Sequence, residues 1–203
     1  WWSDAAVACW EQRKSSKVME GAPNSETHSA GALRVIDAMS AYRNDPFRGA
    51  VERRVIDDDK KSSDIEVCAG LAALADANVD ASEIDLLIVY STVPDFLTTP
   101  NAALVHEKLG LRRACFSLQV DMACNSFMSQ IEIANAMIRS GQAKRALLIQ
   151  SSAFSRTLMP EDASSPWVGD GAGAIVMGPV TNNFGFLSIA SRTDGSVHQS
   201  ART

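Results

Sequence analysis

The sequence predicts an α/β fold in which helices cover a layered, largely parallel sheet. The first observation is a set of short apolar runs typical of buried strands, at residues 84–90, 115–120 and 146–149. The second is a helical spacing of apolar residues between those runs. The third is the punctuation of the junctions by glycine and proline, as at Pro100, Gly110 and Gly141.

The first half of the pattern contains two helices and one strand. Ser63 and Glu66 form a capping-box pattern at the start of a helix that continues to Asn78. Its predicted buried side consists of Ile65, Cys68, Ala69, Leu71, Ala72 and Ala75. The strand at 84–90 is followed by a proline-bracketed loop, 92–100, and a helix over 101–109. A further helix is expected near the N-terminus, over 31–42.

The second half is organised around a long helix that we expect to open at Cys124. Its apolar positions are Phe127, Met128, Ile131, Ile133, Ala134, Met137 and Ile138. Gly141 lies where a left-handed C-cap is usually needed. The strand at 146–149 follows, and residues 172–177 and 184–191 are predicted to form the last two strands.

Composition narrows the class of protein. A hydrophobic content of 46% and a charged content of 21% are ordinary for a globular domain. The net charge of -5, with no basic block, argues against a nucleic-acid partner. Four cysteines without regular spacing indicate a reducing compartment, so we expect a cytoplasmic protein without a metal site. No apolar run or leader predicts contact with a membrane.

Cys124 is the candidate nucleophile because it lies at the predicted junction between a strand and a helix. The N–H groups of a helix start lower a thiol pKa and stabilise negative charge on whatever the sulfur attacks. The alternative is a buried cysteine acting as a small hydrophobic residue, the interpretation that fits Cys68 and Cys115. His106 lies on a predicted helix, where a packing or surface role fits better than catalysis.

Residues 121–127, 140–162 and 167–177, in this order, resemble the thiolase superfamily. The similarity is greatest to the type III β-ketoacyl-acyl-carrier-protein synthases and their acyltransferase relatives. It extends over residues 49–196 and includes the segment 169–174, with sequence GDGAGA. The chain thus divides into a poorly matched cap or insertion, 1–48, and a thiolase-like N-terminal half-domain, 49–203. The complete family fold is a layered αβαβα structure.

The resemblance implies an acyl-Cys124 intermediate formed from acyl-coenzyme A or acyl carrier protein. Condensation with a malonyl-type thioester would follow, as in fatty acid or polyketide biosynthesis. Alternatives are a ketosynthase-like acyltransferase making an ester or amide, and a noncatalytic dimer subunit. The family implies a homodimer and no permanently bound cofactor.

The same resemblance suggests substrate-binding residues. Arg156 aligns with an arginine at the coenzyme's adenine end, and Trp167 is expected to wall the acyl tunnel. Phe96 and Thr99, on a loop that approaches the dimer twofold, are candidates to line the neighbour's acyl pocket. An ordinary surface arginine and an ordinary loop are the alternatives.

Three departures from the family are visible. The family's coenzyme-binding Trp and Arg fall near Arg43 and Phe47, so that pair is not reproduced. The catalytic His and Asn belong to the family's second half, after Thr203. The first strand, expected in the middle of the sheet, would precede Trp1. We therefore expect a second half, in the same or another chain, to complete the site.

Overall fold

The computed structural model describes residues 8, 29–40, 50–159, 165, 167–180 and 185–197. Most of the predicted cap at 1–48 lies outside these residues, apart from helix α2, Ala30–Met39. The predictions concerning Arg43 and Phe47 also lie outside the described residues.

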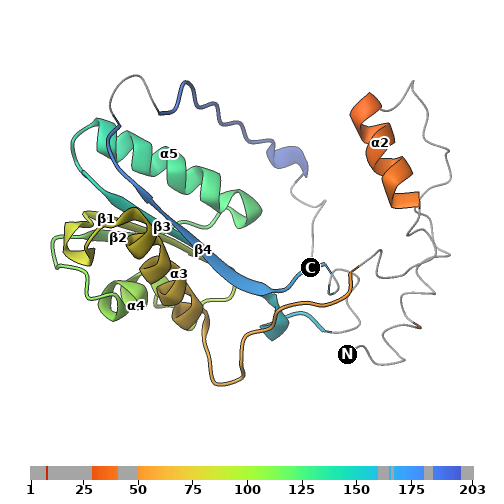
Figure 1. Cartoon of the computed structure of the whole chain (residues 1–203), viewed down its shortest axis with the longest axis horizontal. Helices are drawn as coiled ribbons and strands as arrows, with labels where there is room; N and C mark the ends of the chain where they lie inside the picture. Colours follow the sequence, from red (N-terminus) through yellow and green to blue (C-terminus); the bar gives the residue numbers. More distant parts are fainter. Residues whose placement is uncertain are drawn as a thin grey trace.

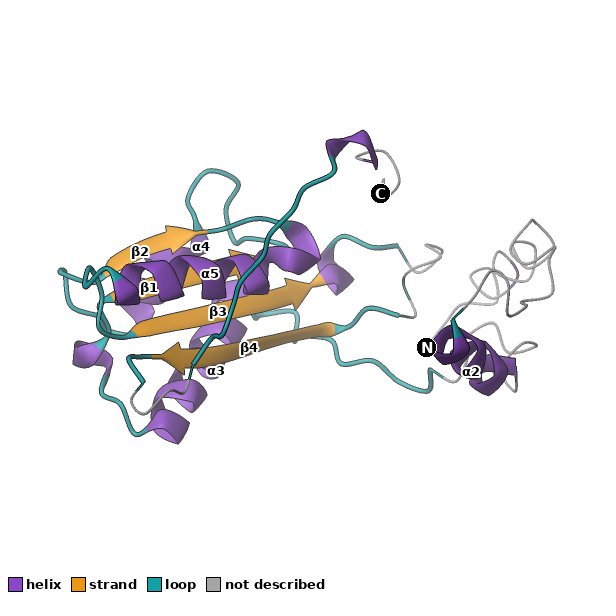
Figure 2. Ribbon diagram, turned by 90° about the horizontal axis from the view of Figure 1, so that it is seen from above, coloured by secondary structure: helices purple, strands orange, loops and turns teal. Residues whose placement is uncertain are grey.

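A four-stranded sheet in the order β2-β1-β3-β4 forms the centre of the described structure. Its strands are β1 (Leu86–Ser91), β2 (Phe116–Gln119), β3 (Ala146–Ala153) and β4 (Asp170–Met177). β1 pairs in parallel with both β2 and β3, whereas β4 runs antiparallel to β3, as Figure 2 shows. The prediction of a largely parallel sheet is therefore confirmed.

Helices cover both faces of the sheet, as the continuous apolar runs of β1 and β3 predict. Alternate residues of each strand point to opposite faces. Leu87 and Ile149 pack with α3 (Ser62–Ala77) and α4 (Asn101–Lys108), while Leu86 and Leu148 face α5 (Ser126–Arg139). Figure 1 shows this layering, with α5 on one side of the sheet and α3 and α4 on the other.

Several helix ends match the sequence prediction. Gly110 and Gly141 have φ angles of 65° and 76° and follow the last turns of α4 and α5. Glycine takes this left-handed conformation without the penalty that a Cβ imposes. Asn78, with φ 51°, ends α3 in the same way. Short 3₁₀ turns occur at Ala81–Glu83, Ala123–Asn125, Phe154–Arg156 and Gly195–Val197.

The predicted buried face of α3 is wrong. Cys68, Leu71, Ala72 and Ala75 are exposed, and the helix instead buries Ser62, Ser63, Glu66, Gly70 and Leu74. Hydrogen bonds satisfy the polar members of this face, and Gly70 lets the helix approach Ile149 and Leu109 closely. The capping box is also shifted, since Lys61 N donates to Asp64 Oδ2 at 2.9 Å.

Two strand predictions are corrected as well. Among the described residues, β1 and β3 pair directly over six residues, from Leu86↔Ala146 to Ser91↔Ser151, so the sheet of this chain has no gap at its centre. Residues 185–191 do not form a strand. Ser191 Oγ donates a hydrogen bond to Glu132 Oε2 on α5, at 2.6 Å.

Within the described residues, every helix is too short or too polar to cross a lipid bilayer.

Candidate active site

Cys124 lies between the end of β2 and the start of α5. The helix was expected to open at this cysteine, but α5 begins at Ser126, and Cys124 belongs to the preceding 3₁₀ turn. Its side chain is exposed. The interpretation of Cys124 as a buried hydrophobic residue is therefore wrong, and the thiol is accessible at the N-terminal end of α5.

Local polar contacts fix the turn that carries Cys124. Ser126 Oγ accepts a hydrogen bond from Met122 N at 2.8 Å, and Asp121 Oδ1 accepts one from Ala123 N at 3.1 Å. Ala123 has a φ of 49°, a left-handed conformation that is uncommon for residues other than glycine. Backbone conformations of this kind persist where the surrounding structure enforces them, frequently at functional sites.

The thiol opens into a cleft of about 360 Å³ formed at the carboxyl ends of β1 and β3 and along the start of β4. Sequence reasoning missed most of its lining. The residues that line it besides Cys124 are Tyr90, Thr92, Ala123, Gln150, Ser151, Ser152, Phe154, Gly171, Ala172 and Gly173. One signal was available, because ligands of open α/β sheets bind beyond the carboxyl ends of the strands.

Gln150 brings an unusual polar group to this cleft. Its Oε1 is buried and has no hydrogen-bond partner among the described residues. The fully buried Gln130 of α5 also leaves its Oε1 unpaired, while its Nε2 donates to Ile149 O at 3.1 Å. Buried polar atoms are usually paired, so these two amides are exceptions on the side of the sheet that faces α5.

The GDGAGA segment, residues 169–174, leads into β4 and packs closely at only one of its glycines. The closest approach is at Gly169, where a Cβ would lie 3.0 Å from Arg54 O. Gly171 and Gly173 line the cleft, and a Cβ there would meet no described atom within 4 Å. Asp170 joins the segment to its surroundings, because its carboxylate accepts hydrogen bonds from Ile56 N and Ser155 N, both at 3.0 Å.

Arg156 points toward the turn at residues 56–60. Its Nη2 donates to Asp57 O at 2.6 Å and, over 3.4 Å each, to Ile56 O and Lys60 O. Its Nη1 contacts Asp58 Oδ1 at 3.2 Å. Nη1 and Nη2 of the guanidinium are therefore engaged with the turn at residues 56–60 of the same chain.

Trp167, Phe96 and Thr99 do not line the Cys124 cleft. Trp167 is 49% exposed and precedes β4. Phe96 is equally exposed on the loop at 92–100, where Lys61 Nζ lies 5.1 Å from the centroid of its ring. Thr99 is exposed on the same loop. The structure thus brings Cys124 together with none of the four predicted substrate-binding residues within this chain.

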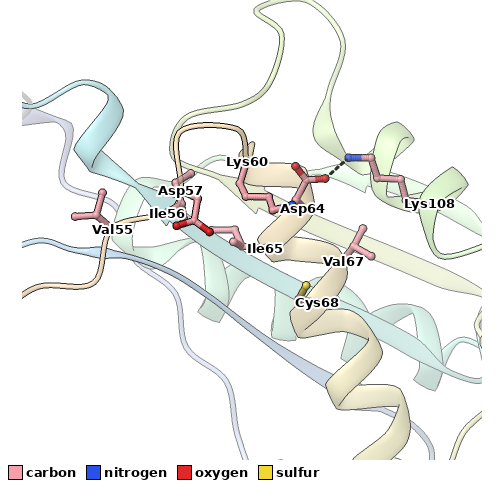
Figure 3. A pocket seen from close by; sticks show the side chains of 9 residues that line it. All are labelled: Val55, Ile56, Asp57, Lys60, Asp64, Ile65, Val67, Cys68 and Lys108. Carbon is pink, nitrogen blue, oxygen red and sulfur yellow. Dashed lines mark hydrogen bonds and ion pairs between the residues drawn. The ribbon is translucent and has the colours of Figure 1, made fainter.

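A second cleft, of about 470 Å³, lies beside α3 and does not include Cys124 (Figure 3). Its lining comprises Val55, Ile56, Asp57, Lys60, Asp64, Ile65, Val67, Cys68 and Lys108. Lys108 Nζ pairs with Asp64 Oδ1 at 2.8 Å and lowers the pKa of that carboxyl. Although this cleft is larger, its one cysteine, Cys68, lies in the second turn of α3 and not at a helix start.

The remaining described groups fit structural roles. Cys115 is buried, and burial raises the pKa of its thiol to about 11, which agrees with the predicted packing role. His106 Nε2 lies 3.2 Å from Arg112 O, consistent with a role within its own segment. No group of three His, Cys, Asp or Glu side chains in the described part of the chain is arranged to hold a metal ion.

Comparison with known proteins identifies the family. A sequence profile of 3-oxoacyl-[acyl-carrier-protein] synthase III matches residues 118–195, which contain Cys124 and the GDGAGA segment. The β-ketoacyl-[acyl-carrier-protein] synthase III of Clostridium perfringens is 39% identical over 150 residues, or 73% of this chain and 46% of the relative. That of Rhodospirillum rubrum is 32% identical over 97% of this chain and 60% of the relative. The chain belongs to the synthase III family.

Solved structures place this synthase III homologue in the thiolase-like α/β fold. The synthase III of Aquifex aeolicus superposes with a TM-score of 0.60 at 30% identity, over 64% of this chain and 42% of that one. Cerulenin-bound OleA of Xanthomonas campestris superposes with a TM-score of 0.57 at 31% identity, over 62% and 41%. The chain spans about half the length of the synthase III relatives that it matches over this region.

Proposed function

We propose that this chain carries the nucleophile of an acyl-thioester transferase, and that the nucleophile is Cys124. The observation that supports this most is the exposed thiol at the N-terminal end of α5, opening into a cleft. Partial positive charge at a helix start favours a thiolate and the oxyanion that follows its attack. The resemblance to synthase III proteins supports the same role.

In the proposed reaction, Cys124 Sγ attacks the carbonyl carbon of an acyl thioester and forms a tetrahedral oxyanion. The carbon–sulfur bond to coenzyme A or acyl carrier protein then breaks, and the released thiol takes up the proton that Cys124 has lost. A malonyl-type thioester, after losing carbon dioxide, would attack the acyl-cysteine and complete a Claisen condensation. No permanently bound cofactor is required for these steps.

The predicted substrate contacts remain part of this proposal. Arg156 would meet the adenine end of coenzyme A, while its Nη2 donates to backbone carbonyls of residues 56–60. Trp167 would wall the acyl tunnel. Phe96 and Thr99, on the exposed loop at 92–100, would reach the acyl pocket of the second subunit of a homodimer.

Condensation also requires a His and an Asn near Cys124. His106 is the sole histidine among the described residues, and its ring is engaged with Arg112 O. We therefore propose that a C-terminal half, in the same or another chain, supplies both groups. A cytoplasmic location is the corresponding expectation.

The test is transfer of an isotopically labelled acyl group from acyl-coenzyme A, located by peptide mass spectrometry. We expect the label on Cys124 and its loss in Cys124→Ser. Cys68 is also exposed and serves as an internal control for nonspecific acylation. A folded, complete protein that leaves Cys124 unlabelled contradicts the proposal.

One observation favours a second candidate, a noncatalytic subunit that contributes a dimer face. None of the described residues offers a general base beside Cys124, since the cleft lining contains neither histidine nor a carboxylate. The two candidates differ in thiol reactivity. An activated Cys124 should react with iodoacetamide at neutral pH at least about tenfold faster than Cys68, whereas a noncatalytic subunit should alkylate both at similar rates.

A further inference from the structure

A buried polar cluster lies directly behind the Cys124 cleft. Glu66, on α3, is completely buried, as is Asn101 at the start of α4. Glu66 Oε1 accepts a hydrogen bond from Ser151 Oγ at 2.5 Å, and Oε2 accepts one from Asn101 Nδ2 at 3.0 Å. Asn101 Nδ2 also contacts Ser91 Oγ, at 3.2 Å. The two oxygens of one carboxyl thus bridge α4 and β3.

On one side, this cluster reaches the cleft. Ser151 is both the hydrogen-bond partner of Glu66 and a lining residue of the Cys124 cleft. Its carbonyl accepts hydrogen bonds from Thr92 N at 3.3 Å and Thr92 Oγ1 at 2.9 Å. Thr92 also lines the cleft. Holding Ser151 therefore fixes two positions of the surface that a substrate of Cys124 would meet.

On the other side, the cluster holds the base of the loop at 92–100. Asn101 Oδ1 accepts a hydrogen bond from Asp95 N at 2.9 Å. The Asp95 carboxylate accepts hydrogen bonds from Ser63 N at 3.1 Å and Ser63 Oγ at 2.6 Å. The same loop carries Phe96. Glu66 consequently links this loop to the cleft through single hydrogen bonds to Asn101 and to Ser151.

Burying the carboxyl of Glu66 costs folding free energy through desolvation, and hydrogen bonds offset this cost only in part. Glu66 has no cation in contact among the described residues, and the charged groups that face it are Asp95 and, beyond Ser63, Lys108. Burial raises the pKa of Glu66 and the Asp95 carboxylate adds to that effect. An apolar residue at this position would avoid the desolvation of the carboxyl, but it would not join Asn101 to Ser151.

We propose that Glu66 is a positioning residue for acyl transfer. Through its two hydrogen bonds it holds Ser151, which lines the Cys124 cleft, in a fixed position relative to Asn101 at the base of the 92–100 loop. This inference rests on the proposed function of Cys124. It assigns Glu66 no contact with the substrate. Its loss should weaken the productive binding of a thioester and leave the intrinsic reactivity of the thiol unchanged.

The test compares Glu66→Gln and Glu66→Leu with the unchanged chain. A neutral amide has nearly the same shape and can pair with Ser151, whose hydroxyl donates or accepts, whereas leucine can pair with neither neighbour. For each protein, the acylation of Cys124 is followed against thioester concentration, together with the rate of alkylation by iodoacetamide and the melting temperature. Glu107→Leu, at an exposed position of α4, is the matched control.

We expect Glu66→Leu to raise the half-saturating thioester concentration about tenfold, with a maximal rate and an alkylation rate within about twofold of the unchanged chain. Glu66→Gln and Glu107→Leu should stay within about threefold. If Glu66→Leu does not fold, Ser151→Ala, which removes one hydrogen bond of the cluster, should show the same shift at smaller size.

Unchanged acylation in the folded Glu66→Leu chain, or in Ser151→Ala where the leucine variant does not fold, overturns the proposal. A parallel loss of acylation and alkylation, which would indicate only a structural role, also overturns it. A chain whose Cys124 accepts no acyl group even without substitution contradicts the proposed function, and the inference about Glu66 falls with it.

Discussion

At the scale of single residues, the described site depends on polar groups that the hydrophobic pattern does not reveal. Glu66 lies on the buried face of α3, whereas the apolar periodicity of the sequence predicted that the opposite face of this helix is buried. Its burial became possible because Asn101 and Ser151, 35 and 85 residues away in the sequence, complete its hydrogen bonds. A single sequence contains no direct signal for pairing over such separations.

Glu66 should make the stability of the chain depend on pH. Burial raises its pKa above the ordinary value for glutamate, about 4.3. The folded chain then keeps a proton that the unfolded chain has released, so the free energy of unfolding falls as the pH rises from the unfolded to the folded pKa. Glu66→Gln should remove this decline and be more stable at pH 8 by on the order of 1 kcal/mol, typical of single substitutions.

Urea denaturation at pH 4 and pH 8 measures this effect. The advantage of Glu66→Gln should shrink at pH 4, where the carboxyl is largely protonated in both states. An advantage of equal size at both pH values would show that ionisation of Glu66 is not its cause.

Gln150 leads to a second prediction at this scale. Its buried Oε1 lacks a partner among the described residues, and an unpaired buried polar atom costs about 1–3 kcal/mol. Gln150→Met, which is similar in length and apolar, should therefore raise the free energy of unfolding by roughly 1 kcal/mol. Denaturant unfolding checks this, with the exposed Gln142→Met as control. A loss of stability would mean that Gln150 has a partner in solution.

At the scale of elements, α3 is where sequence and structure differ most. The apolar periodicity predicted that Cys68 and Leu71 are buried, but in the structure α3 buries Gly70 and Leu74 against the sheet. The reason is steric, because a Cβ at Gly70 would lie 3.1 Å from Ile149 Cδ1 and 3.2 Å from Leu109 Cδ1. Such close packing between helix and sheet needs a residue without a side chain, which periodicity counts as a gap.

Other elements could be predicted because their signals are local. The strand runs at β1 and β3, and the C-terminal glycines of α4 and α5, depend on neighbouring residues only. Cys124 was predicted as the nucleophile from its junction between a strand and a helix together with the family resemblance of the surrounding residues. The start of α5 was placed two residues too early, because a 3₁₀ turn and the first turn of an α-helix have the same sequence signals. The individual residues that line the cleft depend on tertiary pairing, so the sequence predicts only its place beyond the carboxyl ends of the strands.

Gly70→Val tests the packing of α3 on the sheet. The added methyl groups must displace Ile149 or Leu109, and overpacking of a core costs typically 1–3 kcal/mol. We expect a loss of about 2 kcal/mol in the free energy of unfolding, measured by urea denaturation. Ala72→Val, at an exposed position of the same helix, should cost under about 1 kcal/mol through helix propensity alone. Equal losses in the two variants would contradict the close contact.

At the scale of the whole molecule, the described residues form a sheet with one helical layer on each face, and apolar side chains remain exposed outside it. Leu97 is 100% exposed on the 92–100 loop, and Met128 is 59% exposed on α5. Exposed apolar groups of this size are typical of surfaces that contact another protein. They agree with the proposed homodimer and with the proposed second half.

Leu97→Asp should weaken the proposed homodimer. A charge at a fully exposed position has little effect on folding, but it is costly to bury in an interface. We expect the mass measured by light scattering to shift toward the monomer at micromolar concentration, with the melting temperature within about 2 °C. Leu187→Asp, at a position 96% exposed outside the loop, is the control. An unchanged mass for Leu97→Asp would argue against this loop as the dimer contact.

β4 forms one margin of the sheet, and beyond Asp170 N, which bonds to Arg54 O, the described residues provide no strand alongside it. The unpaired backbone N–H and C=O groups of such an edge strand can pair with an extended segment of another chain, including an identical molecule. When the chain is purified at high concentration with nothing paired to β4, it should therefore be prone to aggregate by pairing of β4 edges between molecules. A short peptide that seals β4 would keep it dispersed.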